Sequence, residues 1–260
     1  MKTESAKPPW FPEMRIFGID GLPEIHPGDD LPALLFARLS STPFLFMAGD
    51  ICVVTQKIIS KTEGCLVDLK TVTPSRFAQD VADRIHKDPR VVEVVLRESK
   101  RIVRMDRDII ICETRHGFIC ANAGVDQSNV PGDSIVSVLP PNPDESARKF
   151  REGLHKYFQL DIPVIITDTF GRPWREGLTN VAVGVSGLSP LIDLRGKKDA
   201  YGYELKKTLI AVADEIAAAA ELIMKKTEGI PLAILRGYTY QKSEAGSQPL
   251  LRSPERDLFR

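Results

Sequence analysis

Short runs of apolar, largely β-branched residues recur along the chain and predict buried strands. The clearest runs occupy 51–55, 163–167 and 230–235. Weaker runs predict further strands at 14–18, 102–105, 108–113, 117–120 and 180–185. The run at 51–55 is typical of a parallel strand inside a sheet, and the carboxyl end of such a strand is where α/β proteins place ligands.

Apolar residues spaced three or four positions apart predict helices at 30–39, 74–87, 89–98, 144–158 and 208–226. Asp30, with Pro32 in the first turn, is expected to cap the first helix, and Asp144 the fourth. Phe77 is expected on the buried face of the second helix, at 74–87. The helix at 208–226 is predicted to be the longest, and its alanine-rich, charge-poor sequence requires cover from other protein, with a second subunit as one candidate.

The chain is long enough for one large or two modest domains, since it has 260 residues of which 43% are hydrophobic. We assign 1–13 to a polar N-terminal tail and 14–260 to the folded part, with a candidate boundary between substructures at the Pro-Pro-Asn-Pro segment 140–143. A tight turn is predicted at 115–117, which would leave His116 exposed.

Charge and targeting signals narrow the class of protein. Lys plus Arg and Asp plus Glu both number 35, so no overall field attracts nucleic acid or an anionic membrane. The N-terminus lacks the apolar core of a signal peptide, and no apolar run is long enough to span a bilayer, so a cytoplasmic protein is expected. The four cysteines lack metal-type spacing and are expected to be free thiols.

Two loops carry candidate metal ligands. Asp168 and Thr169 follow the strand predicted at 163–167, before a Gly-Arg-Pro turn, and Asp126 lies in a loop that follows the strand predicted at 117–120. Carboxylate and hydroxyl oxygens at such positions suit a hard cation beside an oxygen-rich, anionic substrate. The alternative for each segment is a capped turn with surface charges.

Lysines follow the strand at 51–55 and are candidates for binding phosphate. Lys57 and Lys61 come directly after its carboxyl end, although lysines in general are more often solvated surface residues. The glycine- and proline-rich segment 21–30 is either a rigid ligand-contacting loop or a plain connector. No G-x-x-x-x-G-K-[ST] or G-x-G-x-x-G motif occurs, so a nucleotide would have to be held in another way.

Six sequence blocks, in this order, resemble the coenzyme F420:L-glutamate ligase family. They are GLPE at 21–24, PGDD at 27–30, VTQK at 54–57 with SKTEG at 60–64, GVDQSN at 124–129, ITDTFGR at 166–172 and AVADE at 211–215. The resemblance covers nearly the whole chain. It implies an α+β fold with a mixed sheet and an intertwined homodimer. It also implies a GTP- and divalent-metal-dependent enzyme that adds L-glutamate to the free carboxylate of F420-0 and then adds further γ-linked glutamates.

The resemblance also assigns roles to residues. It places GTP against Leu22, Pro23, Glu24, Ile25, Gln56, Lys61 and Asn129, and it makes Asp126, Asp168 and Thr169 ligands of Mg²⁺ or Mn²⁺, with K⁺ as a further candidate ion. Gln56 departs from the small polar residue that family members often have there. The nitroreductase-like domain that some relatives carry after the ligase is not expected here, because the sequence stops at Arg260.

Charge and position suggest further roles. Lys61 is the candidate for binding the phosphates, and Arg172, Arg175 or Lys197 for binding the anionic substrate, with Arg172 also counted as a catalytic candidate. Carboxylate activation by phosphoryl transfer needs metal ions but no nucleophilic side chain, and the sequence has no G-x-S-x-G elbow and no metal-like histidine pair.

Two other functions fit the same residues. A metal-dependent phosphohydrolase could use the two aspartates, and a chain that had lost turnover would be a nucleotide- or F420-binding module. Nucleotide consumption that requires glutamate separates the ligase from the hydrolase, and any turnover excludes the binding module.

Overall fold

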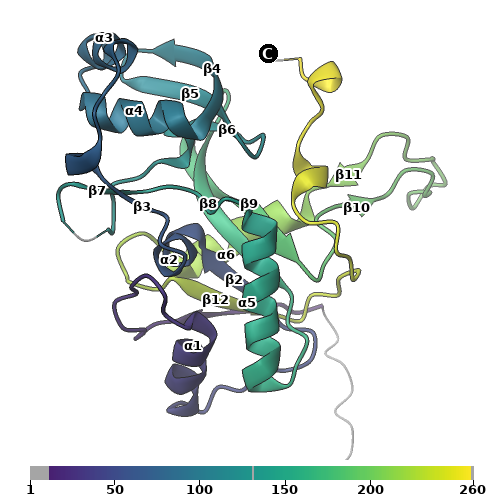
Figure 1. The fold of residues 1–260 in the computed structure, drawn as a ribbon. Helices are drawn as coiled ribbons and strands as arrows, with labels where there is room; N and C mark the ends of the chain where they lie inside the picture. Colours follow the sequence, from purple (N-terminus) through teal and green to yellow (C-terminus); the bar gives the residue numbers. More distant parts are fainter. Residues whose placement is uncertain (1–11, 131, 259–260) are drawn as a thin grey trace, which may run out of the picture.

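A five-stranded mixed sheet forms the centre of the computed structural model, which describes residues 12–130 and 132–258 (Figure 1). Most of the predicted N-terminal tail, residues 1–11, lies outside the described residues. The strand order is β1-β12-β2-β8-β9, in which β2 and β8 run parallel and the other neighbours antiparallel. The strands are β1 (Arg15–Ile19), β12 (Leu232–Arg236), β2 (Ile51–Thr55), β8 (Val164–Arg172) and β9 (Arg175–Ser186).

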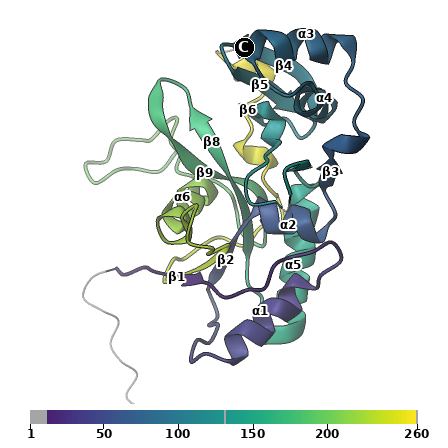
Figure 2. The same ribbon diagram turned by 90° about the vertical axis from the view of Figure 1, so that its left-hand side faces the viewer.

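Helices cover both faces of this sheet (Figure 2). Helices α1 (Leu31–Ser40) and α5 (Pro143–Phe158) pack on one face, and α6 (Val212–Met224) packs on the other. Strand β2 alternates between the two cores, since Cys52 and Val54 join the first and Ile51 and Val53 the second. Burial on both faces is the reason for its continuous apolar sequence, as predicted.

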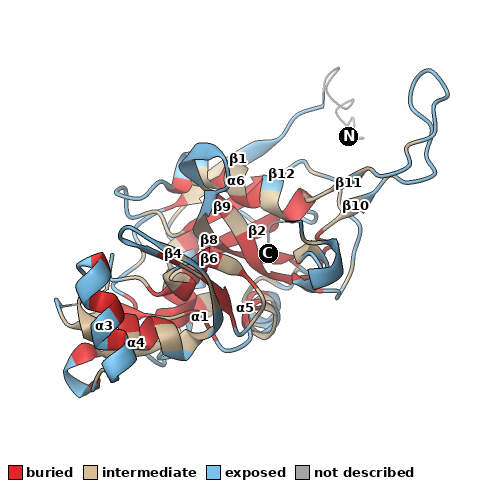
Figure 3. Cartoon of the chain, turned by 90° about the horizontal axis from the view of Figure 1, so that it is seen from above, coloured by how far each residue is buried: buried red, intermediate tan, exposed pale blue. Residues whose placement is uncertain are grey.

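A third core lies beside the central sheet, under the helices α3 (Arg76–Ile85) and α4 (Pro89–Glu98). These helices pack on a three-stranded sheet of β4 (Ser99–Asp106), β5 (Ile109–Thr114) and β6 (Ile119–Ala121). Figure 3 shows that buried and exposed residues alternate along both helices. The chain connects this layer to the central sheet through α2 (Gln56–Thr62) and a two-stranded sheet of β3 (Leu66–Asp68) and β7 (Ile135–Ser137).

The parallel pairing of β2 and β8 brings two chain segments to one edge of the sheet. Thr55, the last residue of β2, pairs with Thr167, so α2 begins beside Asp168. The β8–β9 register shifts between Ile166 and Thr167, a bulge-type irregularity that often lies next to functional sites. Strand β8 continues to Arg172, so the prediction that the strand ends at Thr167 is wrong. Its parallel partner β2 ends beside Thr167 instead.

Two helix predictions need correction. The helix predicted at 208–226 begins only at Val212, because Leu209 and Ile210 form the short strand β11, and it ends at Met224 rather than at Lys226. It has 13 residues, whereas α5 has 16 and is the longest helix of the described ranges. Helix α5 is capped by Asn142, whose side chain accepts from the Glu145 amide, and not by Asp144 as predicted. The Asp144 carboxylate instead accepts from the amides of Val185 and Ser247.

Two side chains lie elsewhere than predicted. Phe77 is 54% exposed, because the buried face of α3 consists of Ala78, Val81, Ala82 and Ile85. His116 lies in the predicted turn but is half-buried, with Nε2 at 2.9 Å from the carbonyl oxygen of Pro140. The cap predicted at Asp30 is confirmed by a hydrogen bond from the Ala33 amide. Ser75 caps α3 in the same way by accepting from the Ala78 amide.

The remaining elements are short. They are β10 (Ile192–Asp193), β11 (Leu209–Ile210), and the 3-10 turns η1 (Leu69–Thr71), η2 (Asn122–Gly124), η3 (Gln248–Leu250) and η4 (Pro254–Arg256). The loop between β10 and β11 extends away from the rest of the chain (Figure 1). The architecture is α+β with a mixed central sheet, as predicted. Across the residues described, no helix is long and apolar enough to cross a membrane.

Candidate functional site

A cavity of about 790 Å³ opens where β2 and β8 reach the edge of the sheet. Segments that lie far apart in the sequence line it. All ten residues that the family resemblance assigned to nucleotide or metal are among the lining residues: Leu22, Pro23, Glu24, Ile25, Gln56, Lys61, Asp126, Asn129, Asp168 and Thr169. The fold therefore brings four separate sequence blocks to one place.

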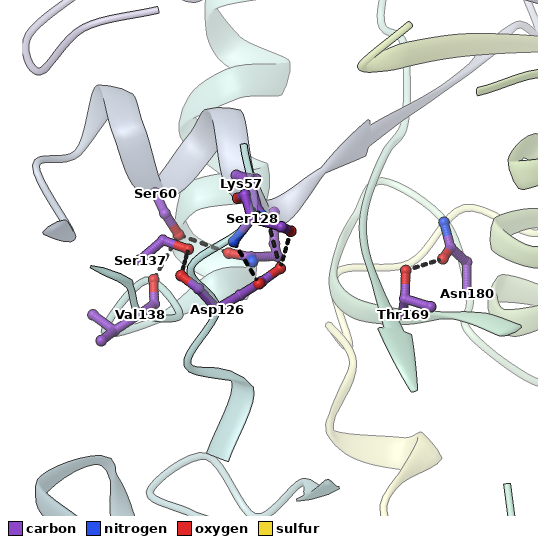
Figure 4. A network of polar contacts seen from close by, with 9 residues as sticks. Lys57, Ser60, Asp126, Ser128, Ser137, Val138, Thr169 and Asn180 are labelled. Atoms are coloured by element: carbon purple, nitrogen blue, oxygen red, sulfur yellow. Dashed lines mark hydrogen bonds and ion pairs between the residues drawn. The ribbon is translucent and has the colours of Figure 1, made fainter. Parts of the chain in front are cut away.

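Asp126 is held by its backbone and by both carboxylate oxygens. Its amide and carbonyl pair with Ser137 at the end of β7, at 3.1 and 2.8 Å. Oδ1 accepts from the Ser128 amide at 2.8 Å, and Oδ2 accepts from the Ser128 hydroxyl at 2.8 Å and from Lys57 Nζ at 2.5 Å (Figure 4). Burial alone would raise the pKa of Asp126, but the hydrogen bonds and charge from Lys57, with those from Ser128, outweigh it and lower the pKa. Asp126 is therefore ionised at neutral pH.

Asp168 lies in a different environment from Asp126, although both line the same cavity. Burial raises the pKa of Asp168 to about 6, and the negative charge of Asp126 acts in the same direction. A hydrogen bond from the Thr169 amide and the charges of Lys226 and Lys57 offset these effects only in part. The hydrogen bond and positive charges around Asp168 therefore only partly offset the effect of burial on its ionised carboxylate.

Thr169 is held by the neighbouring strand. Its hydroxyl donates to Oδ1 of Asn180 at 2.7 Å, and Asn180 Nδ2 donates to Oε2 of Glu221 at 2.7 Å. Asn180 is 3% exposed and comes from β9, whereas Glu221 comes from α6. The Thr169 hydroxyl proton is therefore committed to Asn180, and the oxygen keeps lone pairs for another partner.

Residues of α2 and of the 21–30 loop that are candidates for nucleotide binding contact each other at the wall of the cavity. Lys61 Nζ donates to Glu24 Oε1 at 2.6 Å, and the Lys61 side chain is 9% exposed. The amide of Gly28 donates to the carbonyl oxygen of Thr62 at 2.8 Å, which fixes the loop against α2. Gln56 is buried beside the cavity and contacts the Ser60 hydroxyl at 2.8 Å.

Sequence reasoning missed the segment between α6 and β12. Lys225, Lys226, Thr227 and Gly229 line the cavity, as do Asn180 and Glu221. The available signal was the KKTEG sequence at 225–229, which places two adjacent lysines in a loop directly after a helix. Their position relative to Asp168 depends on the packing of α6, which the local sequence does not specify.

The three arginine and lysine candidates for the anionic substrate do not line this cavity. Arg172 lies at the tip of the β8–β9 hairpin, where Nη2 donates to the carbonyl oxygen of Glu176 at 2.6 Å. Arg175 lies exposed on the same hairpin, and Lys197 lies exposed in the loop between β10 and β11. In this chain their side chains are separate from the two aspartates.

The donor set fits a hard divalent cation. Asp126 and Asp168 provide carboxylates, and Thr169 provides a hydroxyl oxygen. Burial, with the charge of Asp126 as a smaller contribution, raises the pKa of Asp168, and a bound cation would stabilise its ionised form. Within the described ranges, no three Asp, Glu, His or Cys side chains converge as a complete metal centre. A Mg²⁺ ion commonly takes one or two carboxylates and completes its shell with phosphate oxygens and water, so two carboxylates suffice here.

A second, larger cavity of about 1,040 Å³ lies between α5, the end of β9 and residues 244–248. Its charged groups pair with each other, since Arg151 contacts both Asp161 and Glu244, and Arg148 contacts Glu145. The cavity around Asp168 also contains ion pairs, but among the described residues its Asp168 carboxylate has no ion-pair partner. We therefore assign the candidate site to the cavity that holds the two aspartates.

The cysteines do not provide a nucleophile in this site. All four are free, as predicted, and Cys52, Cys112 and Cys120 are buried. Burial raises the pKa of Cys120 to about 12 and that of Cys65 to about 11, so little thiolate is present at neutral pH.

Comparison with known proteins identifies the family of the chain. Residues 20–237 match the family model described as F420-0:Gamma-glutamyl ligase. The chain is 46% identical over 248 residues to the coenzyme F420:L-glutamate ligase of Methanothermobacter thermautotrophicus, covering 94% of this chain and 98% of the relative. Identity to the ligases of Methanopyrus kandleri and Archaeoglobus fulgidus is 45% and 39%, over 96% and 95% of this chain and 98% and 96% of those relatives. The chain therefore belongs to the F420-0:gamma-glutamyl ligase family.

Proposed function

We propose that the protein is a GTP-dependent ligase that joins L-glutamate to the free carboxylate of F420-0 and extends the product through γ-linkages. Family membership supports the glutamate ligation in F420 biosynthesis. One structural observation supports the use of a nucleotide and a metal. The residues assigned to GTP and to the divalent cation come from four separate segments and line one cavity.

In this proposal two groups of lining residues have different tasks. GTP is held by Leu22 to Ile25, Gln56 and Asn129. Its phosphates are bound by Lys61 and by Lys226, which the sequence analysis did not indicate. Asp126, Asp168 and Thr169 hold Mg²⁺ or Mn²⁺, with K⁺ as a candidate second ion. The acidic groups and the lysines are interleaved around the cavity, which suits a complex of triphosphate and cation because both charges must be balanced.

The chemistry follows from the poor reactivity of a carboxylate. The F420-0 carboxylate attacks the γ-phosphorus of GTP, GDP leaves, and the acyl phosphate that results is attacked by the amino group of glutamate with release of phosphate. A divalent cation, when bound, neutralises charge that builds on the β- and γ-phosphate oxygens. Lys61 and Lys226 orient the phosphates, and Asn180 holds the Thr169 hydroxyl in place.

Mass spectrometry of F420-0 incubated with the protein, GTP, Mg²⁺ and glutamate tests the proposal. Products heavier by one or more glutamyl residues, with GDP and phosphate formed in equal amounts, are expected. GTP hydrolysis at the same rate without glutamate and F420-0 would instead favour the phosphohydrolase, and no GTP turnover under any condition would favour the binding module. Asp168→Asn is the matched control, because it removes one charge from the cation site and is expected to abolish turnover.

Labelled oxygen tests the acyl-phosphate route. F420-0 carrying heavy oxygen in its carboxylate is expected to transfer one label to inorganic phosphate. Label in GMP together with pyrophosphate would contradict attack at the γ-phosphorus, and with it the metal roles of Asp126, Asp168 and Thr169.

We also propose that the protein is a homodimer, as its family resemblance implies. Large apolar side chains exposed in one chain support this: Trp174, Leu178, Tyr201, Tyr203 and Leu222 are 79%, 66%, 97%, 65% and 74% exposed. A monomer in sedimentation at micromolar concentration would contradict this proposal.

A further inference from the structure

The ammonium group of Lys57 lies on a candidate metal ligand. Lys57 Nζ is 2.5 Å from Asp126 Oδ2, 2.5 Å from the carbonyl oxygen of Ser128 and 2.8 Å from the Ser128 hydroxyl (Figure 4). An ammonium has three protons to donate, so these contacts use its full capacity. The Lys57 side chain is 15% exposed, so this arrangement is not that of a freely solvated surface lysine.

The fold determines where Lys57 lies. Strand β2 ends at Thr55 and α2 begins at Gln56, so Lys57 is in the first turn of the helix, at the edge of the cavity. Asp126 reaches the same place from a loop 69 residues further along the chain. Lys57 therefore provides Asp126 with a positive charge from within the protein.

The two candidate metal ligands differ in this respect. Oδ2 of Asp126 already has a cation, and Oδ1 accepts from the Ser128 amide. No ion pair or side-chain hydrogen bond to the Asp168 carboxylate is found among the described residues. The Asp168 carboxylate accepts a hydrogen bond from the Thr169 amide but has no cationic partner in the described part of the chain, whereas Asp126 already has one in Lys57. A divalent cation that binds both carboxylates therefore competes with a protein cation only at Asp126.

We propose that Lys57 is an exchangeable counter-ion of Asp126, which a divalent cation displaces and which then binds a phosphate oxygen of the nucleotide. The proposal rests on the proposed metal- and nucleotide-dependent function. Lys57 lines the same cavity as Lys61 and Lys226, so its released ammonium is within the region assigned to the phosphates. The exchange stabilises each state, because Asp126 has a cationic partner before and after metal binding and Lys57 has an anionic one once the nucleotide is present.

Metal binding to variants gives the first test. Mn²⁺ titration followed by electron paramagnetic resonance is carried out without nucleotide on the wild type, Lys57→Met, Lys57→Gln and Lys61→Met. Each variant removes one positive charge from the cavity, but Lys61 pairs with Glu24 rather than with a metal candidate. Exchange predicts that both Lys57 variants bind Mn²⁺ roughly fivefold or more tightly than the wild type, on the scale of one lost ion pair, while Lys61→Met changes by less than twofold.

Lysine labelling of the unaltered protein gives the second test. Brief reaction with acetic anhydride, followed by peptide mass spectrometry, measures the reactivity of each lysine. Lys57 is expected to be protected in the metal-free protein, to react at least about threefold faster with saturating Mg²⁺, and to become protected again when a non-hydrolysable GTP analogue is added. Lys61 serves as the internal reference and is expected to be insensitive to Mg²⁺ alone.

The outcomes separate this inference from the proposed function. Unchanged Lys57 reactivity with bound metal, equal tightening in the Lys57 and Lys61 variants, or weaker Mn²⁺ binding in the Lys57 variants would each overturn the exchange and leave Lys57 as a fixed partner of Asp126. These outcomes would leave the proposed function intact, because glutamate-dependent GTP turnover tests that function separately. If the wild type binds no Mn²⁺ even with GTP, both the exchange and the metal site are wrong.

Discussion

The Thr169 hydroxyl donates to Oδ1 of Asn180 at 2.7 Å, across the pairing of β8 with β9. Asn180 in turn donates to Glu221 of α6, so three elements fix the rotamer of a candidate metal ligand. Groups that orient metal ligands in this way strongly affect metal affinity. Asn180 is thus a positioning residue that no sequence motif indicated.

Replacing Asn180 is expected to weaken metal binding. Asn180→Leu removes the acceptor of the Thr169 proton, so the hydroxyl can rotate and its lone pairs are no longer directed by the protein. We expect the Mn²⁺ dissociation constant to rise roughly tenfold or more. Leu178→Ala, at an exposed position of the same strand, is the control and should change it by less than twofold. Equal metal affinity in Asn180→Leu and the wild type would show that Asn180 has no part in the cation site.

The two aspartates are expected to differ in their effect on stability, although Asp126→Asn and Asp168→Asn should both abolish ligase activity. In metal-free protein at pH 7.5, Asp168→Asn removes a poorly compensated charge and should raise the melting temperature by about 2 °C or more. Asp126→Asn leaves Lys57 without its charged partner and should lower it by roughly 2–4 °C. Differential scanning calorimetry in EDTA measures both, and shifts of the same sign would contradict the environments assigned to them.

The pH dependence of stability is expected to reflect Asp168. Its pKa is about 6 in the native protein, against an ordinary value of 3.8, so between these values the native state holds a proton that the unfolded chain has released. The contribution of Asp168 to the free energy of unfolding therefore decreases as the pH rises from about 4 to about 6 and is constant above that range. Urea unfolding of the wild type and Asp168→Asn should show a stabilisation by the mutation at pH 8 that disappears near pH 4. A difference independent of pH would disprove this pKa.

The segment after α6 is expected to bind the nucleotide phosphates. Lys226 lines the cavity, and its charge acts on Asp168. Lys226→Ala should weaken GTP binding roughly tenfold in the presence of Mg²⁺ and should reduce the dependence of that affinity on salt. Lys206→Ala, at an exposed position outside the cavity, is the matched control. Isothermal titration calorimetry distinguishes the two, and equal affinities would remove Lys226 from the site.

Arg172 is expected to be dispensable for nucleotide and metal binding. Its guanidinium donates to the hairpin carbonyl of Glu176 and lies outside the cavity, so Arg172→Ala should leave the dissociation constants of GTP and Mn²⁺ within about twofold. A large loss of GTP affinity in this variant would indicate that the hairpin reaches the site of another copy of the chain. Titration at several protein concentrations separates that case from a local effect.

Most of the secondary structure could be predicted because its signals are local. The apolar run at 51–55 is a strand buried on both faces, and Asp30 with Pro32 begins a helix, since capping and periodicity depend on neighbouring residues. The errors arose where a side chain forms hydrogen bonds with residues that are distant in the sequence. Asp144 was predicted to cap α5, but its carboxylate binds the amides of Val185 and Ser247, and Asn142 caps the helix.

The sequence by itself determined which residue types the candidate site contains, because the motifs at 21–25, 56–61, 126–129 and 168–169 are contiguous in the chain. The tertiary structure decided which residues lie together. The parallel register of β2 and β8 places α2 beside Asp168, the packing of α6 adds Lys226, and the hairpin carries Arg172 away. The Lys57–Asp126 contact spans 69 residues, and its existence depends on strand register and helix packing, which long-range burial rather than local propensity determines.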